Sequence, residues 1–354
     1  MATRRRTGGP IRPAAGVRDD LTIKDIARMA GVSVATVSRV INGSGFVTAE
    51  KHDLVQEVLS RVNYIPNNAA RALVSRRTRA VGLIVPTLAN PLFAPTIAGV
   101  ENRLRDAGYG LFLACSDRSA RKELDHARTM IEHGVDGIIL NGSHRHRALL
   151  PLLAARGIAV VSVDDPIGTE GVQSIAMPDP AAMACAIDAL VAAGHDRIAI
   201  LTGPLATTPA IQERLRGARD RLAEHGRACA PGAIVETPDY SMEAARSGAA
   251  TLLALRPRPT AIACTGDILA IGVVDQCRRL GLDVPGDISV VGCGQTVMAQ
   301  FVTPELTTVR LPFRELGEAG AERLLCLIDR QRHPRPPSLP YSFVPGATVS
   351  PPKA

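Results

Sequence analysis

Residues 22–43 read TIKDIARMAGVSVATVSRVING, and this stretch decides the fold of the N-terminal part of the chain. Thr22 and Asp25 have the spacing of a helix-capping box, in which Asp replaces the more usual Glu or Gln. Apolar residues then recur at helical spacing, so that they share one face of a short helix. Gly31 interrupts this pattern and predicts a turn.

A second helix is expected directly after this turn. Ser33 can cap it, and the helical pattern covers residues 34–41 before Gly43 ends it. A third helix is expected from a Thr48 cap to about Asn63. Two short helices joined by a tight glycine turn are the signature of a helix-turn-helix motif.

The second helix of such a motif enters the major groove of DNA, and side chains near its N-terminus reach the base edges. Arg39 can make a bidentate contact with guanine, whereas Val34 and Ala35 can offer only apolar contacts, for example to thymine methyl groups. Thr36 and Ser38 can hydrogen-bond phosphates or bases. Packing roles within the motif are expected for Ala27, Gly31, Val37 and Val40.

The net charge of +7 is concentrated in the N-terminal part of this 354-residue chain. Residues 1–79 contain 14 Lys and Arg against 6 Asp and Glu, which gives +8, and the remaining residues together carry −1. A basic excess at one end suits binding to a polyanion, although a solvated basic tail would give the same count. Residues 1–20 are rich in Arg, Gly and Pro and lack the apolar core of a secretory signal, so we expect a disordered basic tail.

No apolar run approaches the roughly 18 residues that a membrane span needs, so we expect a cytoplasmic protein. The seven cysteines are scattered and never spaced as C-x-x-C, which argues against a disulfide framework and a zinc site. We therefore expect no metal and no cofactor. His144 and His146 have a ligand-like spacing, but we interpret them as part of a solvated basic loop. His195 is interpreted as a helix-end residue and not as a catalytic one.

From Val81 onward, short apolar runs alternate with helical stretches. The runs are residues 81–85, 110–114, 137–140, 159–163, 197–201, 260–263 and 288–291. Such alternation predicts right-handed βαβ units with parallel strands. Two successive sets predict two doubly wound lobes, with a crossing near residues 164–173 and a return near residues 291–311. Ligands bind at the carboxyl ends of such strands, and two facing lobes form a hinged cleft.

Residues 22–43 resemble the LacI family of transcription regulators, whose members carry the pattern T-I-x-D-V-A-x-x-A-G-V-S-x-x-T-V-S-R-V-x-N-G. This resemblance implies that Val34 and Ala35 help to select the operator half-site. It continues through YIPNNAARAL, residues 64–73, which in the family form a hinge helix that folds on DNA. It further implies that Leu73 enters the minor groove as a wedge that kinks the duplex. The DNA-contacting residues implied in this way are Thr22, Ser33, Val34, Ala35, Thr36, Ser38, Arg39, Asn42, Tyr64, Asn67, Arg71 and Leu73.

The LacI resemblance covers nearly the whole chain, including VPGDISVVG at residues 284–292, and implies a periplasmic-binding-protein-like effector domain. It places Asp164 against ligand hydroxyls, Arg214 against hydroxyls or a carboxylate, and Tyr240 against a sugar face. Asp267 is expected either to contact the ligand or to orient the loop beside it. The other implied effector-binding residues are Leu88, Asn90, Phe93, Asp117 and Gln295.

The chain departs from the family pattern at two places in the expected cleft. Gly266 stands where an Asn is common, and Gly294, beside Gln295, stands where sugar-binding members have an Asp that grips vicinal hydroxyls. With Arg214 retained, these departures predict a less acidic pocket. The expected effector is a sugar acid, a phosphorylated metabolite, or a sugar held differently.

The expected fold is an all-α helix-turn-helix DNA-binding domain with a hinge helix, followed by a two-lobed α/β domain with parallel sheets. The expected boundaries are a basic tail (1–20), the helix-turn-helix domain (21–66), the hinge helix and linker (67–79) and the effector-binding and dimerisation domain (80–350). Because one recognition helix reads one half-site, a homodimer on a palindromic operator is expected. The chain after Arg330 is Pro-rich and has no leucine heptads, so no tetramerising coiled coil is expected.

The predicted function is that of an operator-binding regulator, a repressor, controlled allosterically by a small metabolite between the lobes. An enzyme is the main alternative, but no Walker loop, G-x-G-x-x-G, G-x-S-x-G or H-E-x-x-H motif is present. An exported solute-binding protein is the second alternative. It would need a signal peptide and would have no helix-turn-helix.

Overall fold

The computed structural model describes residues 21–43, 45–64, 77–143, 145–168, 170–331 and 338–353. The chain divides into two compact units, and the boundary between them in the sequence lies between Arg77 and Thr78. Among the described residues, no helix is both long enough and apolar enough to cross a membrane.

The first unit contains three helices, α1 (Ile23–Met29), α2 (Val34–Asn42) and α3 (Ala49–Arg61). The capping box at the start of α1 is present, because the backbone N–H of Thr22 donates to Asp25 Oδ2 at 3.0 Å while the Asp25 N–H donates to Thr22 Oγ1 at 3.4 Å. Ser33 caps α2 by accepting a hydrogen bond from the Thr36 N–H at 3.1 Å. Thr48 precedes α3, but its side chain makes no capping hydrogen bond there.

The core of the first unit lies where the three helices meet. Ile26 of α1, Val37 of α2 and Val55 of α3 are completely buried, and Val40 and Val58 are nearly so. Burial of such side chains stabilises a small domain by roughly 1.5–3 kcal/mol each. The packing roles predicted for α2 are therefore confirmed for its two inward-facing valines.

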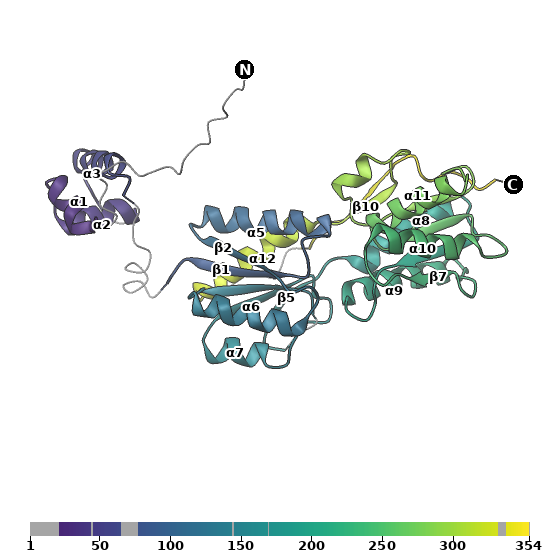
Figure 1. The fold of residues 1–354 in the computed structure, drawn as a ribbon, viewed down its shortest axis with the longest axis horizontal. Helices are drawn as coiled ribbons and strands as arrows, with labels where there is room; N and C mark the ends of the chain where they lie inside the picture. The colour runs from purple at the N-terminus through teal and green to yellow at the C-terminus, as the bar shows by residue number, and fades with distance from the viewer. Residues whose placement is uncertain are drawn as a thin grey trace, which may run out of the picture. The chain divides into compact units, whose positions relative to one another are not determined.

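The first lobe of the second unit is a five-stranded parallel sheet in the order β2-β1-β3-β4-β5. Its strands are β1 (Ala80–Val85), β2 (Gly110–Cys115), β3 (Gly137–Asn141), β4 (Ala159–Val163) and β5 (Gln173–Ile175). One face is covered by α5 (Ala94–Asp106) and α12 (Phe313–Ile328), the other by α6 (Ala120–Glu132) and α7 (Leu149–Ala155) (Figure 1). Successive β1 residues alternate between these faces, as the pleat of a strand requires.

The second lobe is a four-stranded parallel sheet in the order β7-β6-β8-β9. Its strands are β6 (Ile198–Thr202), β7 (Ile234–Glu236), β8 (Ala261–Cys264) and β9 (Ser289–Val291). The covering helices are α8 (Asp179–Ala192) and α9 (Pro209–Glu224) on one face, and α10 (Met242–Leu253) and α11 (Asp267–Arg279) on the other. Two short 3-10 helices, η1 (Pro91–Phe93) and η2 (Val297–Gln300), complete the unit with the antiparallel pair β10 (Thr308–Arg310) and β11 (Ser342–Val344).

The outward crossing between the lobes lies later in the chain than predicted. Residues 164–173 join β4 to β5, and both strands belong to the first sheet. The predicted crossing at that segment is therefore wrong, and the chain passes to α8 only after Ile175. The reason is that β5 has three residues, Gln173, Ser174 and Ile175, of which only the last is apolar and buried, so it shows no apolar run. The predicted return near residues 291–311 agrees with the passage from β10 to α12.

Two glycines allow α5 and α12 to approach each other closely. A Cβ atom on Gly317 would lie 2.1 Å from the carbonyl oxygen of Thr96, and one on Gly99 would lie 2.2 Å from that of Arg314. Both distances are far below any van der Waals contact, and in each case the obstacle is backbone. The close packing of α5 against α12 therefore requires glycine, which has no side chain, at positions 99 and 317.

We predict that Gly317→Ala lowers the free energy of unfolding of the second unit by about 1–3 kcal/mol, because overpacking outweighs the better helix propensity of alanine. Urea unfolding followed by circular dichroism measures this. Glu318→Ala, on the next residue of α12, serves as control and should stay within about 0.5 kcal/mol of the wild type. A Gly317→Ala protein as stable as the wild type would show that the helices do not meet at this glycine.

Candidate nucleic-acid interface and effector cleft

The N-terminal half of α2 presents a small surface to solvent. Val34 is 41% exposed, Ala35 and Arg39 are also exposed, and Thr36 and Ser38 are half-buried. These positions lie opposite Val37 and Val40, which pack inward, so the helix has one structural face and one open face. The open face carries one guanidinium and two small apolar groups, which suits the edge of a base pair.

The other predicted DNA contacts lie around this helix or outside the described residues. The hydroxyl groups of Thr22 and Ser33 already serve as caps, with Thr22 Oγ1 donating to Asp25 Oδ2 at 2.6 Å. Asn42 is the last residue of α2. Tyr64 is half-buried and packs against the core of the first unit. Asn67, Arg71 and Leu73 lie outside the described residues, as does His144.

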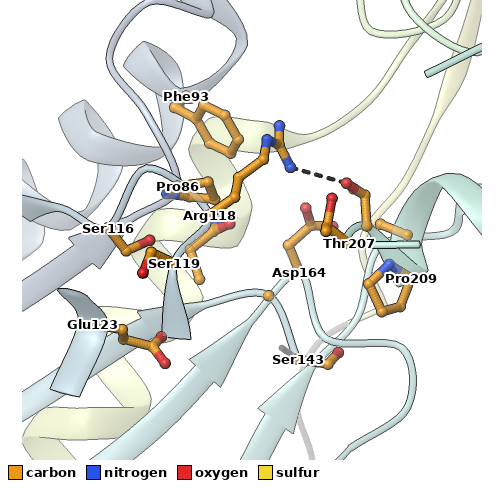
Figure 2. A pocket seen from close by; sticks show the side chains of 14 residues that line it. Pro86, Phe93, Ser116, Arg118, Ser119, Glu123, Ser143, Asp164, Thr207 and Pro209 are labelled. Carbon is orange, nitrogen blue, oxygen red and sulfur yellow. Dashed lines mark hydrogen bonds between the residues drawn. The ribbon is translucent and has the colours of Figure 1, made fainter. Parts of the chain in front are cut away.

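A cleft lies between the two lobes of the second unit and consists of two adjoining pockets that share Pro86, Arg118 and Thr207. The inner pocket is bordered by loops that follow β1 to β4 and by the start of α9 (Figure 2). The outer pocket adds residues from the loop that follows β7. The side chains of the predicted set that line these pockets are Asn90, Phe93, Asp117, Asp164 and Tyr240.

Asp164 borders the inner pocket and carries an open hydrogen-bonding position. It follows β4 with a left-handed φ of +54°, and its buried Oδ1 has no hydrogen-bond partner within the described part of the chain. Burial, together with the carboxylate of Asp179, raises the pKa of Asp164 to about 7. A buried acceptor without a partner is costly, so this oxygen is suited to receive a hydroxyl group from a ligand.

Arg214 is predicted to contact the effector, and in the structure it is paired with a carboxylate. Its side chain is almost completely buried, its Nε donates to Asp179 Oδ1 at 2.6 Å, and its Nη1 donates to the carbonyl oxygen of Thr265 at 2.9 Å. Burial opposes the charge, but the Asp179 carboxylate more than compensates and raises the pKa of Arg214. Arg214 borders neither pocket. Arg214 is therefore a paired charge, and its positive charge also acts to lower the pKa of Asp164 and of Tyr240, two residues that do line the pockets.

Arg118 is a cleft residue that the sequence interpretation missed. It belongs to the first lobe, has a left-handed φ of +57°, and donates from Nη1 to Thr208 Oγ1 of the second lobe at 2.9 Å (Figure 2). Its guanidinium also lies 5.7 Å from the ring centroid of Tyr240, a cation–π distance. In the sequence, the only indication of a cleft position for Arg118 was that it directly follows Asp117, in the loop after a predicted strand.

Tyr240 lines the outer pocket, as predicted, and burial raises the pKa of its phenol to about 12. Its ring depends on Gly203, because a Cβ there would lie 2.3 Å from the phenol oxygen. Asp117 also lines the outer pocket but pairs with Lys122 at 2.7 Å. Asn90 uses its side-chain oxygen to accept from the Leu92 N–H at 3.0 Å.

Asp267 orients the neighbouring loop, which is one of its two predicted roles. Its Oδ2 accepts from the Thr296 N–H at 2.5 Å and its Oδ1 accepts from Thr308 Oγ1 at 2.6 Å, while burial raises the pKa of the carboxyl. Gly294, in the same loop, has a φ of +135°, and a Cβ there would lie 2.9 Å from Leu92 Cδ1. An aspartate at 294 would therefore be strained. Gln295 is half-buried with φ +51°, and Leu88 is mostly exposed; neither borders the two pockets.

The structure bears on two sequence interpretations concerning charge. The two pockets are lined by four carboxyl groups, those of Asp117, Glu123, Asp164 and Asp239, and by one arginine, and a pocket less acidic than that of sugar-binding members stays a prediction. The solvated basic loop predicted around His146 is wrong for Arg145. The Arg145 side chain is only 6% exposed, and it pairs with Asp165 at 3.3 Å.

His146 and His195, the other two histidines considered in the sequence, are hydrogen-bonded to groups of the protein itself. His146 Nδ1 accepts from the Ala148 N–H at 3.1 Å, and His195 is hydrogen-bonded to Thr260 Oγ1 and to the Ser350 carbonyl oxygen, each at 2.9 Å. The His146 bond lies within a single turn of its loop, whereas His195 joins two segments that are distant from it in the sequence. This agrees with a structural interpretation of His195.

Two family models match the chain: residues 22–67 match "Bacterial regulatory proteins, lacI family", and residues 187–349 match "Periplasmic binding protein-like domain". The ribose operon repressor of Haemophilus influenzae is 36% identical over 305 residues, which cover 86% of this chain and 91% of that protein. The chain belongs to the LacI family. The HTH-type transcriptional repressor PurR of Photobacterium profundum is 34% identical over 89% of this chain and 94% of its own length.

A solved structure of a LacI-family member has the same fold. The lac repressor dimer bound to operator and the anti-inducer ONPF has a TM-score of 0.80 and 27% sequence identity, covering 93% of this chain and 99% of that chain. The predicted fold is thereby confirmed. The LacI-family chain is a DNA-binding transcriptional regulator with an effector-binding cleft between its lobes, and not an enzyme.

We predict that Asp164→Asn gains stability relative to the wild type as the pH rises from 5 to 8. The wild-type carboxyl ionises near pH 4 when unfolded but only near pH 7 when folded, so its stabilising contribution is present at low pH and lost between those values. Asparagine cannot ionise and tolerates a left-handed φ. The relative gain in the free energy of unfolding should be about 1 kcal/mol or more, measured by urea unfolding at both pH values.

Asp106→Asn, at the exposed end of α5, provides the matched control and should show no such pH-dependent gain. If Asp164→Asn and Asp106→Asn behave alike across this pH range, the Asp164 carboxyl does not titrate in a buried environment.

Proposed function

We propose that this LacI-family chain is a repressor that binds a palindromic operator as a homodimer and changes its operator affinity when a small metabolite occupies the cleft. The observation that carries the proposal is the division of α2 into a buried face and an open face. Val37 and Val40 fix the helix to its unit, while Val34, Ala35 and Arg39 are exposed. Relatives that are named as repressors support repression, and not activation, of transcription.

The major-groove reading is assigned to α2. Arg39 recognises a guanine through O6 and N7, and Val34 and Ala35 contact thymine methyl groups. Leu73 is assigned the minor-groove wedge at the operator centre on sequence alone, because residues 65–76 lie outside the described part of the chain. Binding to chromosomal operators also supports a cytoplasmic location.

The proposed effector is a neutral polyhydroxy compound, and the composition of the cleft lining is the reason. The two pockets are lined by four carboxyl groups and a single arginine, so groups that can accept from hydroxyls outnumber cationic groups that could hold a carboxylate or phosphate. Arg214 is paired with Asp179 and borders neither of these pockets. Hydroxyl groups, in contrast, donate to carboxylates and accept from threonine, serine and asparagine side chains.

Control of DNA binding requires the effector to favour one arrangement of the lobes over another. Arg118 is suited to couple the cleft to this arrangement, because it reaches from the first lobe to Thr208 and Tyr240 of the second. A ligand in the inner pocket would compete with or reinforce these contacts. Lobe closure is thereby linked to occupancy of the site.

The homodimer proposed here is supported by exposed apolar side chains on both lobes. Phe112 and Leu113 are more than a third exposed on β2, at the edge of the first sheet, and Phe301 is 80% exposed at the end of η2. Large exposed apolar groups on an edge strand are unusual unless another chain covers them. The lac repressor structure with the same fold is a dimer.

We predict that Arg39→Ala weakens binding to the chain's own operator by about tenfold or more and relaxes discrimination at one base pair, because a bidentate guanine contact is worth about 1–3 kcal/mol. Binding to operator variants, followed by fluorescence anisotropy, measures both effects. The control Arg28→Ala also removes one exposed positive charge and should weaken binding to every sequence alike. Unchanged base preference in Arg39→Ala would exclude the proposed readout.

We predict that Phe112→Asp combined with Phe301→Asp converts the dimer to a monomer at micromolar concentration, because charges would replace apolar contacts in the interface. Light scattering coupled to size-exclusion chromatography gives the mass. Ile167→Asp serves as control, since Ile167 is 69% exposed in the β4–β5 loop and is assigned no partner. A double variant with the mass of the wild-type dimer would show that the interface lies elsewhere.

A further inference from the structure

The second unit begins at Thr78, and its first two residues are held by one carboxylate. The backbone N–H of Thr78 donates to Asp136 Oδ1 at 3.0 Å, and that of Arg79 donates to Asp136 Oδ2 at 2.9 Å. The Thr78 hydroxyl group donates to the Gly134 carbonyl oxygen at 2.6 Å and lies 3.2 Å from Asp136 Oδ1. We call Thr78, Arg79 and Asp136 the entry cluster.

Main-chain hydrogen bonds hold the same segment on both sides of β1. The N–H of Gly110, at the start of β2, donates to the Arg79 carbonyl oxygen at 2.8 Å, and the N–H of Asp136 donates to the Ala80 carbonyl oxygen at 2.8 Å. Arg79 has a left-handed φ of +55°, a conformation that a residue with a side chain keeps only where its surroundings hold it. These bonds fix the direction in which the chain enters the first sheet.

The elements that end or begin at the entry cluster also border the effector cleft. Helix α5 begins directly after Phe93 and ends in the turn at Gly108, whereas α6 begins directly after Ser119 and ends in the turn at Gly134. Phe93 and Ser119 line the inner pocket, while a Cβ on either glycine would lie within 3.2 Å of a side chain of the entry cluster. Strand β1 leads from the entry cluster to Pro86, which lines both pockets.

The first lobe therefore has the cleft at one edge of its sheet and the entry cluster at the other. Helices α5 and α6 have 13 residues each and lie along the sheet between these edges (Figure 1). A helix of this length spans about 20 Å. The carboxylate of Asp136 is thus remote from the effector, and Asp136 does not line either pocket.

We propose that Asp136 is a positioning residue for operator recognition. By holding Thr78 and Arg79, it fixes where and in which direction the chain leaves the first lobe toward the DNA-reading unit. It thereby sets the spacing between the two half-sites that the dimer accepts. This inference rests on the proposed function, because a spacing exists only where two copies of the chain read one palindrome.

The physical basis is the effective concentration of the second DNA-reading unit once the first has bound its half-site. This concentration depends on how widely the connecting chain can move from the point at which the lobe holds it. A held chain favours one spacing. A released chain gains conformations, which lowers the effective concentration at the correct spacing and raises it at other spacings.

A purely structural role of Asp136 would have a different effect. Loss of hydrogen bonds to a part-buried carboxylate lowers the free energy of unfolding, so a smaller fraction of the protein is folded. That fraction enters equally into binding to every DNA. The preference of the folded molecules for one spacing over another would then stay as in the wild type.

The test measures binding of the full-length protein to three DNA duplexes by fluorescence anisotropy. The first carries a palindromic operator selected from random DNA with the wild-type protein, the second has one base pair added at the operator centre, and the third has a single half-site. The added base pair moves the half-sites apart by about 3.4 Å and rotates them by about 35°. We expect the wild type to bind the longer operator about tenfold or more weakly.

Asp136→Ala should weaken binding to the selected operator by about tenfold, keep the half-site affinity within about twofold, and reduce the penalty of the added base pair to about threefold or less. Asp136→Asn keeps one acceptor oxygen and should show an intermediate effect. Thr78→Val removes only the hydroxyl group and should change the spacing preference in the same direction.

Asp106→Ala is the matched control, because it makes the same change at the exposed end of α5 and should leave all three affinities unchanged. Urea unfolding shows whether each variant is folded, and Thr78→Val takes the place of Asp136→Ala if the latter is not. A folded variant that discriminates between the two spacings as the wild type does overturns the proposal. An equal loss of affinity for all three duplexes also overturns it.

The wild-type measurements separate this proposal from the proposed function. A wild-type protein that selects no palindrome, or that binds the palindrome no more tightly than the half-site, would overturn the proposed function itself. A wild-type protein that binds both spacings of a selected palindrome equally well would overturn the role of Asp136 alone.

Discussion

A buried parallel sheet requires every strand to be followed by a crossover of the same hand, so the carboxyl ends of its strands meet at one edge. Each lobe of this LacI-family chain obeys that constraint, and the cleft is the result. The first lobe brings Arg118 after β2, Ser143 after β3 and Asp164 after β4 to one edge. The second brings Thr207 after β6 and Tyr240 after β7. Residues that are far apart in the sequence thereby line one cleft.

Buried charges in the second unit link elements that are distant in the sequence. Arg214 pairs with Asp179 at 2.6 Å and thereby holds α9 to α8. Arg145 pairs with Asp165 at 3.3 Å and joins the loops after β3 and β4. Asp179, Asp164 and Glu123 each keep one buried oxygen without a hydrogen-bond partner within the described residues. Removal of one partner from a buried pair of this kind is destabilising, because it leaves the other charge uncompensated.

Local signals in the sequence predicted the local structure well. The capping box at Thr22, the glycine turn at Gly31 and all seven apolar runs correspond to elements of the structure. Four strands, β5, β7, β10 and β11, were not predicted, because each has three residues that are not all buried and so forms no apolar run, whereas the equally short β9 is fully buried. Because β5 was not predicted, the crossing between the lobes was also placed too early in the chain.

The chemistry of the cleft was less predictable, because it depends on contacts between distant residues. Nothing in the sequence indicates that Asp179 neutralises Arg214, since the two are 35 positions apart. Arg145 stands in a segment of polar and basic residues that is typical of a solvated loop, yet its partners lie on other elements. Family resemblance correctly placed Asp164 and Tyr240 at the pockets but gave no indication of Arg118.

The interleaving of the lobes has a consequence for biosynthesis. Helix α12, which covers one face of the first sheet, comes after the whole second sheet in the chain, and the N–H of Val290 in β9 donates to the Thr348 carbonyl oxygen at 2.8 Å. Neither lobe can therefore be completed while the chain is still on the ribosome and residues 313–350 are unmade. A nascent chain must hold an uncovered sheet face until then, which makes it a natural client for chaperones.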